Sequence, residues 1–171
     1  MTAHGTYTTL DGRPAVRFER RIAHPPAAVW RMVTEPAELR HWFPCEVEVD
    51  LRIGGAMRFT FSPDFTQEGE VVELDAPRRF AFMWGADLLR FELDADGDAT
   101  RFTMLHVLNE EGEEAAAKTV AGWHVCLDDM ARRLAGEPRM TEPGKPTPEW
   151  QARYDEYLAR GVPAGAEIPS S

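Results

Sequence analysis

Apolar and polar residues alternate along two parts of the chain, from Pro14 to Ile22 and from Val47 to Leu108. A period of two places every second side chain on the same face of a β-strand, so both parts are predicted to form strands with one buried face. Turn residues divide the second part into consecutive strands; the turns are Gly54-Gly55, Ser62-Pro63-Asp64, Asp75-Ala76-Pro77 and Asp96-Gly97-Asp98. Because no helical pattern separates these strands, they are predicted to form an antiparallel sheet.

Between the two parts, the apolar positions follow the helical period of about 3.6 residues. Pro25-Pro26 and Thr34-Glu35-Pro36 are typical of helix starts, because proline is tolerated in the first turn, so two short helices are predicted there. A long helix is predicted over residues 113–135, where apolar residues recur every three or four positions: Val120, Trp123, Leu127, Met130 and Leu134. This stripe is expected to pack against the inner face of the sheet.

The pattern predicts one domain over residues 14–136 with an extension at each end. Residues 1–13 are small and polar and are predicted to be a flexible N-terminus. Residues 137–171 are predicted to be a Pro-rich linker, a short amphipathic helix at about 148–160 and a disordered end. That helix would present Trp150, Tyr154, Tyr157 and Leu158 on one side.

The order of these motifs resembles the START-like (SRPBCC) superfamily, and within it the branch named after the activator of Hsp90 ATPase homologue 1. The residues that carry the resemblance are Arg21-Ile22, Pro25, Val29-Trp30, Thr34-Glu35-Pro36, Leu39, Trp42-Phe43, Asp50, Arg52, Gly54-Gly55, Gly69, Val71, the run Leu74 to Phe80, Phe82-Met83-Trp84, Thr100 to His106 and Gly122-Trp123. The resemblance implies an α+β, helix-grip (START/Bet v 1-like) fold. In that fold a curved antiparallel sheet of about seven strands surrounds a long C-terminal helix, and two short helices follow the first strand.

The resemblance also implies a deep cavity, which relatives use for lipids, polyketides, hormones or other apolar molecules. The eukaryotic namesake helps to stimulate a chaperone ATPase, and some bacterial relatives are found beside regulators or in stress responses. A hydrophobic or aromatic small molecule is therefore the expected ligand. The aromatic and aliphatic side chains expected to face the cavity are Trp30, Trp42, Met57, Phe59, Phe61, Phe82, Trp84, Phe91, Phe102, Met104, His106, Trp123, Leu127 and Met130. Each of them can equally be ordinary core.

Charge narrows the choice of partners. The 29 acidic residues outnumber the 19 basic ones, so the formal net charge is −10. Nucleic acids and anionic membrane surfaces attract basic proteins, so neither is expected as a partner. No apolar run approaches the ~20 residues of a membrane span, and the N-terminus lacks the pattern of a secretory signal. We therefore expect a cytoplasmic protein.

Few residues are candidates for polar chemistry. Arg20, Glu70 and His106 share the apolar face of their strands, so each is a possible polar contact in the cavity. The alternatives are a strand-end side chain that reaches solvent for Arg20, a position exposed to water at an edge or at the mouth for Glu70, and a core histidine bonded to a backbone carbonyl or water for His106. Neither Cys45 nor Cys126 belongs to a metal-ligand or nucleophile motif. No metal or cofactor is expected, and no catalytic residue is assigned.

The leading hypothesis is a non-catalytic binding protein for a hydrophobic or aromatic small molecule. The first alternative is a protein-interaction role, as a co-chaperone-like or regulatory partner or a homodimer. In this role the helix at about 148–160 docks in a groove of the partner. The alternative for this helix is that it folds back on its own domain or on a dimer mate. The second alternative is a cyclase- or hydrolase-type enzyme, for which His106 with Arg20 or Glu70 would supply acid–base chemistry.

Overall fold

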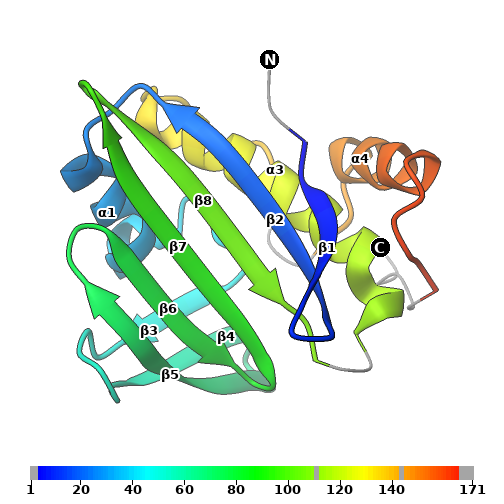
Figure 1. Cartoon of the computed structure of the whole chain (residues 1–171), viewed down its shortest axis with the longest axis horizontal. Coiled ribbons are helices and arrows are strands. Elements are labelled where there is room, and N and C mark those ends of the chain that lie inside the picture. The colour runs from blue at the N-terminus through cyan, green and yellow to red at the C-terminus, as the bar shows by residue number, and fades with distance from the viewer. Residues whose placement is uncertain (1–3, 110–111, 143–144, 166–171) are drawn as a thin grey trace.

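The molecule is built around a single antiparallel sheet (Figure 1). The computed structural model describes residues 4–109, 112–142 and 145–165. The sheet has eight strands in the order β1-β2-β8-β7-β6-β5-β4-β3. Their bounds are β1 (Thr6–Leu10), β2 (Arg13–Ile22), β3 (Glu46–Val49), β4 (Ala56–Ser62), β5 (Phe65–Asp75), β6 (Arg79–Trp84), β7 (Asp87–Asp96) and β8 (Ala99–Val107). The predicted antiparallel sheet is confirmed, with one strand more than the family resemblance implies.

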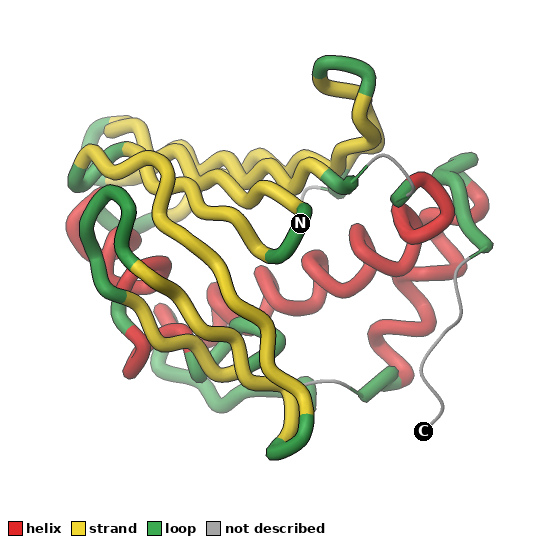
Figure 2. The backbone as a smooth tube through the Cα atoms, turned by 90° about the horizontal axis from the view of Figure 1, so that it is seen from below, coloured by secondary structure: helices red, strands yellow, loops and turns green. Residues whose placement is uncertain are grey.

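The helices lie where the apolar periodicity predicts them. They are α1 (Pro26–Thr34), α2 (Pro36–Leu39), α3 (Ala116–Leu134) and α4 (Pro148–Ala159), and a 3-10 turn, η1 (Glu113–Ala115), leads into α3. Figure 2 shows the sheet curving around α3, which is the helix-grip arrangement. No helix among the described residues is long and apolar enough to span a bilayer.

The inner face of the sheet and the stripe of α3 share one hydrophobic core. Phe59, Phe82, Phe102 and Trp123 all belong to it. The aromatic rings lie in contact along the sheet: Phe59 and Phe82 have centroids 5.6 Å apart, and Phe91 and Phe102 are 5.9 Å apart. Burial of such large apolar side chains is the main stabilising term of the fold.

The N-terminal stretch differs from the predicted flexible segment. Residues 6–10 form β1, an edge strand that pairs with β2 in the register Thr6↔Arg17 to Leu10↔Arg13. Asp11 and Gly12 both have positive φ and make the tight turn between the two strands. Thr and Tyr favour strands through their shape rather than through hydrophobic alternation, so periodicity alone misses this strand.

The extension after α3 packs on the domain at two anchors. Asp129 of α3, 1% exposed, accepts hydrogen bonds from the backbone N–H of Met140 at 2.8 Å and from the hydroxyl of Thr141. Farther along, the fully buried Tyr157 of α4 accepts from the Gly5 N–H at 2.7 Å, and its hydroxyl lies 2.8 Å from Nδ1 of His124. Residues 139–142 and 145–163 are therefore part of the folded unit. The end of the predicted disordered tail, residues 166–171, lies outside the described residues.

Candidate functional site

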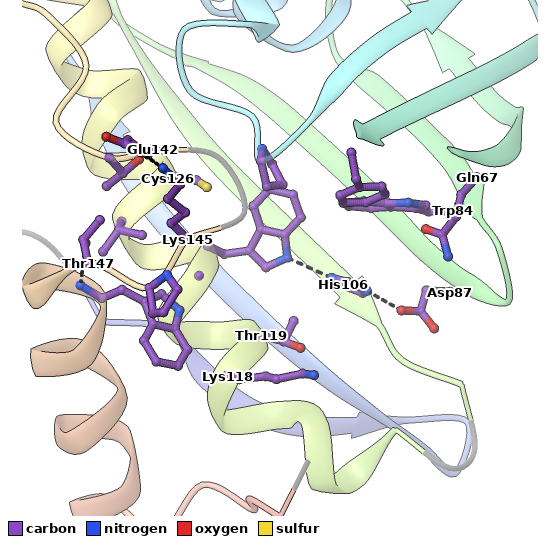
Figure 3. Close-up of a pocket in the computed structure, with 18 of the residues that line it drawn as sticks. Gln67, Trp84, Asp87, His106, Lys118, Thr119, Cys126, Glu142, Lys145 and Thr147 are labelled. Carbon is purple, nitrogen blue, oxygen red and sulfur yellow. Dashed lines mark hydrogen bonds and ion pairs between the residues drawn. The ribbon is translucent and has the colours of Figure 1, made fainter. Parts of the chain in front are cut away.

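A pocket of about 550 Å³ opens at one end of the sheet, beside the first half of α3 (Figure 3). The β6–β7 turn and the end of β8 form one wall, α3 forms the floor, and the segment after α3 forms the opposite wall. The lining includes Phe61, Gln67, Trp84, Asp87, His106, Asn109, Lys118, Thr119, Gly122, Trp123, Cys126, Arg139, Glu142, Lys145 and Trp150. The pocket is therefore formed by one end of the sheet, by α3 and by the segment after α3, which only the fold brings together.

Several aromatic side chains line the pocket. Trp84 stacks on Phe59 with centroids 4.9 Å apart and on Phe61 at 5.9 Å, and it meets Trp123 edge-on at 6.0 Å. Trp150, from α4, faces α3 where Gly122 leaves the helix surface bare: a Cβ at this glycine would lie 3.7 Å from the indole Nε1. Three indoles thus border one hollow, which suits a flat apolar guest.

A chain of hydrogen bonds crosses the wall of the pocket (Figure 3). The indole Nε1 of Trp123 donates to Nδ1 of His106 at 2.8 Å, and Nε2 of His106 lies 2.8 Å from a carboxylate oxygen of Asp87. Because an indole N–H can only donate, Nδ1 must accept, so the proton of the neutral ring is on Nε2 and points at Asp87. Both ring nitrogens of His106 are therefore engaged.

Asp87 closes this chain at the mouth of the pocket. Its other carboxylate oxygen accepts from the backbone N–H of Asn109 at 2.9 Å and from the Asn109 side-chain amide at 3.3 Å. Partial burial raises the pKa of the Asp87 carboxyl, but the hydrogen bonds from His106 and Asn109 outweigh it and hold this pKa below its ordinary value. Asp87 is thus a charged and well-bonded group at neutral pH.

Three cations lie in the lining of the pocket. Arg139 donates to the backbone carbonyls of Arg40 at 3.1 Å and Trp42 at 3.4 Å, and its Nε lies 3.5 Å from Asp129. Arg139 therefore ties the segment after α3 to the end of α2. The other two cations, Lys118 and Lys145, are the only lysines of the chain. An acidic protein thus places both of its lysines at one pocket.

Four of the side chains expected at the cavity line this pocket: Phe61, Trp84, His106 and Trp123. The remaining ones lie instead in the core between sheet and helices, away from the pocket: Trp30, Trp42, Met57, Phe59, Phe82, Phe91, Phe102, Met104, Leu127 and Met130. Met57, Phe82 and Phe91 surround a small gap without room for a water molecule. The centre of the grip is filled because these bulky side chains meet there, so the hollow is displaced to one end.

The two other polar candidates do not reach the pocket. Arg20 does point inward, but its guanidinium bonds to Asp128 of α3 at 3.1 Å. Burial lowers the pKa of Arg20, while the ion pair opposes this effect. Glu70 is exposed on the outer face of β5, because Gly69 and Val71 take the inner positions and a bulge follows between Val71 and Glu73. Of the two alternatives for Glu70, the structure therefore has the solvent-exposed one, and Glu70 is not a contact of the pocket.

The sequence pattern does not identify several of the pocket residues. Asp87 begins β7 and Asn109 follows β8, and Lys118 and Gly122 lie beside the apolar stripe of α3; neither periodicity nor a motif distinguishes these four residues. The segment Arg139 to Trp150 lies beyond the pattern of the family resemblance. One feature of the sequence does distinguish Lys118: only two of the 19 basic residues are lysine.

Nucleophilic and metal chemistry find little support in the lining. Cys126 borders the pocket and Cys45 lies in the core; both are free and buried, and burial raises the pKa of each thiol to about 12. A reactive thiolate is therefore scarce at neutral pH. Among residues 4–109, 112–142 and 145–165, no group of His, Cys, Asp or Glu could hold a metal ion.

Comparisons with known proteins agree on the fold. The family model described as "Activator of Hsp90 ATPase homolog 1-like protein" matches residues 23–135. The conserved protein of unknown function EF2215 from Enterococcus faecalis has a TM-score of 0.74 at 24% identity, with 91% of this chain and 89% of that chain covered. The solution structure of CalU16 from Micromonospora echinospora has a TM-score of 0.71 at 21% identity, covering 91% and 92%.

A further neighbour, DynU16, is described as a putative protein in the dynemicin biosynthetic locus. It has a TM-score of 0.65 at 24% identity, and the match covers 74% of this chain and 49% of that one. The comparison with curated protein sequences finds no match. At these identities the structural neighbours establish the shared fold and say nothing about the chemistry of the pocket.

Proposed function

The chain belongs to the family of activator of Hsp90 ATPase homolog 1-like proteins, and from this membership and the pocket we propose that it binds a hydrophobic or aromatic small molecule without transforming it. The observation that carries the proposal is the hollow of about 550 Å³ bordered by Trp84, Trp123 and Trp150. Pockets for small molecules usually measure about 300–1,000 Å³ and combine an apolar lining with a few polar groups. The origin of DynU16 in a biosynthetic locus is compatible with a small-molecule ligand.

The arrangement of His106 favours binding over turnover. A general base needs a ring nitrogen within reach of the substrate, but Nδ1 receives the Trp123 N–H and Nε2 faces Asp87. Arg20 and Glu70, the residues that would assist it in an enzyme, lie away from the pocket. The histidine is therefore suited to holding the wall of the pocket in one shape.

The tail helix gives less support to a partner-docking role. Trp150 and Tyr157 would be the anchors of a docking helix, yet both are buried against their own domain. A helix that binds a partner in a groove must present its apolar face outward. A co-chaperone-like or regulatory role stays a prediction from the family name, and no contact among the described residues supports it.

Gly122 offers a direct test of the pocket, because a side chain added there points toward Trp150. Gly122→Leu should fill the hollow and weaken binding of the neutral probe N-phenyl-1-naphthylamine at least about tenfold, which equals about 1.4 kcal/mol. Gly122→Ala is the matched control: its Cβ fits, and removal of a mid-helix glycine should stabilise α3 by up to about 1 kcal/mol.

Binding is followed by probe fluorescence and by quenching of the pocket tryptophans, and folding by circular dichroism and thermal unfolding. The proposal fails if wild-type protein does not bind the probe, or if a folded Gly122→Leu variant binds it as well as the alanine variant does.

A further inference from the structure

We propose that the ligand is an elongated aromatic molecule that extends out of the pocket, and that Phe65 contacts its far end and so selects for its length. The inference rests on the proposed function, since it names the shape of the molecule bound in the same pocket and adds a contact outside it. It follows from a row of aromatic rings that starts in the wall of the pocket and ends on the surface.

The rings of this row lie nearly parallel across one end of the sheet. The His106 ring and the Trp84 indole have centroids 6.3 Å apart and planes inclined by 20°. Trp84 and Phe61 follow at 5.9 Å and 17°, and Phe61 and Phe65 at 5.1 Å and 36°. The first three side chains line the pocket, whereas Phe65 lies beyond the lining. The row therefore continues the aromatic surface of the pocket to its outside.

Alternation along β5 places Phe65 on the concave face of the sheet. Phe65, Gln67 and Gly69 are two residues apart and so share one face of the strand. Gln67 lines the pocket beside Trp84 (Figure 3), and a Cβ at Gly69 would lie 2.8 Å from the ring of Phe59 in the core. Phe65 therefore faces the same side as the pocket and the core.

Phe65 is exposed although it faces the side of the sheet that elsewhere forms the core. Its exposed fraction is 51% and that of Phe61 is 39%, whereas Phe59, two residues before Phe61 on β4, is fully buried. Exposed apolar surface that adjoins a groove is typical of binding sites, whereas single scattered residues need no explanation. A molecule longer than the hollow would cover Phe65 and remove this surface from water.

The position of Phe65 makes it a contact for long molecules only. A compact guest would contact the indoles of Trp84 and Trp123 without reaching Phe65. A guest that extends past Phe61 gains the added ring contact, so Phe65 contributes selectivity for length rather than affinity for every aromatic molecule. A second copy of the chain seated on Phe65 is the alternative occupant, and the experiment below detects it through the oligomeric state.

Two neutral probes with the same end groups test the proposal. The phenyl rings of trans-stilbene are joined by one double bond and those of 1,6-diphenyl-1,3,5-hexatriene by three, so the probes differ chiefly in length. Phe65→Ala should weaken binding of the hexatriene about fivefold, the size of one aromatic contact, and change binding of stilbene less than about twofold. Phe65→Tyr keeps the ring and should keep the wild-type affinity for both probes within about twofold.

Ile53→Ala is the matched control, because Ile53 is 66% exposed and lies outside the lining, so either probe should bind within about twofold of wild type. Circular dichroism verifies the fold of each variant, and sedimentation velocity gives its oligomeric state. Equal effects of Phe65→Ala on the two probes, or a dimer that Phe65→Ala dissociates, would overturn the inference and leave the proposed function intact. Binding of N-phenyl-1-naphthylamine but of neither new probe would do the same, whereas binding of none of the three would overturn both.

Discussion

At the scale of single residues, the indole of Trp123 sets the hydrogen bonding in the wall of the pocket. Because the Trp123 N–H can only donate, it fixes the tautomer of His106, and His106 in turn holds the carboxylate of Asp87. The strand parity of β8 correctly indicates that His106 is buried. Its two partners lie 17 and 19 residues away in the chain, and alternation along one strand carries no information about them.

Asp87→Asn tests this chain of hydrogen bonds. Both carboxylate oxygens of Asp87 accept hydrogen bonds, one from the His106 ring and the other from Asn109. Asparagine has one acceptor oxygen, so its amide nitrogen would face the N–H groups of one of these partners and that hydrogen bond would be lost. We therefore expect the free energy of unfolding at pH 7 to fall by about 1–3 kcal/mol. Asp94→Asn, on the same strand with a half-exposed carboxylate, is the matched control and should change stability by less than about 0.5 kcal/mol. Urea denaturation measures both.

The pH dependence of the Asp87 effect follows from the lowered pKa of its carboxyl. A group that binds protons less tightly when folded stabilises the fold above its unfolded pKa of about 3.9, and the stabilisation is lost as the pH falls through the lower folded value. The difference between wild type and Asp87→Asn should therefore shrink below about pH 4, as the folded carboxyl takes up its proton. A constant difference down to pH 2 would contradict this account.

At the scale of elements, β5 and α4 carry the main lessons. Alternation along β5 fails because the bulge between Val71 and Glu73 changes which residues face inward, leaving Val72 exposed. The helix α4 has bounds close to the expected 148–160, but its role comes from where it packs. Trp150 becomes pocket wall and Tyr157 becomes an anchor, because the segment after α3 turns back along that helix.

Tyr157→Phe tests the α4 anchor. Loss of the hydroxyl leaves the buried Gly5 N–H and His124 Nδ1 without this partner, so we expect a loss of about 2–4 kcal/mol in the free energy of unfolding. Tyr154→Phe on the same helix is the control: Tyr154 is half-buried and stacks on Trp150, a contact that phenylalanine retains, so its effect should stay below about 1 kcal/mol.

Hydrogen exchange gives a second reading of the same pair. In the Tyr157→Phe variant the amides of α4 should exchange faster than those of the sheet, because the helix opens locally before the domain unfolds. Equal stability and exchange in the two variants would show that the hydroxyl does not anchor α4.

At the scale of the whole molecule, His124 joins the N-terminus, α3 and α4. Its ring is fully buried, contacts Tyr157 and lies near Arg20, and burial followed by the Arg20 charge lowers the pKa of His124 to about 3. The unfolded chain takes up a proton at this histidine near pH 6.5, whereas the folded protein does not until about pH 3. The contribution of His124 to stability is therefore fully present above pH 6.5 and is lost as the pH falls below it.

This linkage predicts a loss of about 2 kcal/mol in the free energy of unfolding between pH 7 and pH 5. His124→Asn keeps an acceptor for the Tyr157 hydroxyl and removes the titrating ring, so it should flatten the profile in this range. His41→Asn, at a half-buried surface position, should leave most of the slope in place. A slope that is the same in wild type and His124→Asn would rule out His124 as its source.

The sequence by itself determined the elements from β2 onward, their order and the existence of one shared core, because the periods of two and 3.6 record which side of each strand and helix faces away from water. It also contained the family resemblance, which the match over residues 23–135 confirms. Only the tertiary structure decided where the hollow lies. How far Phe59, Phe82 and Phe102 fill the grip, and whether Trp150 closes its end, depend on side-chain volumes from distant segments meeting in space, which periodicity along one segment does not record.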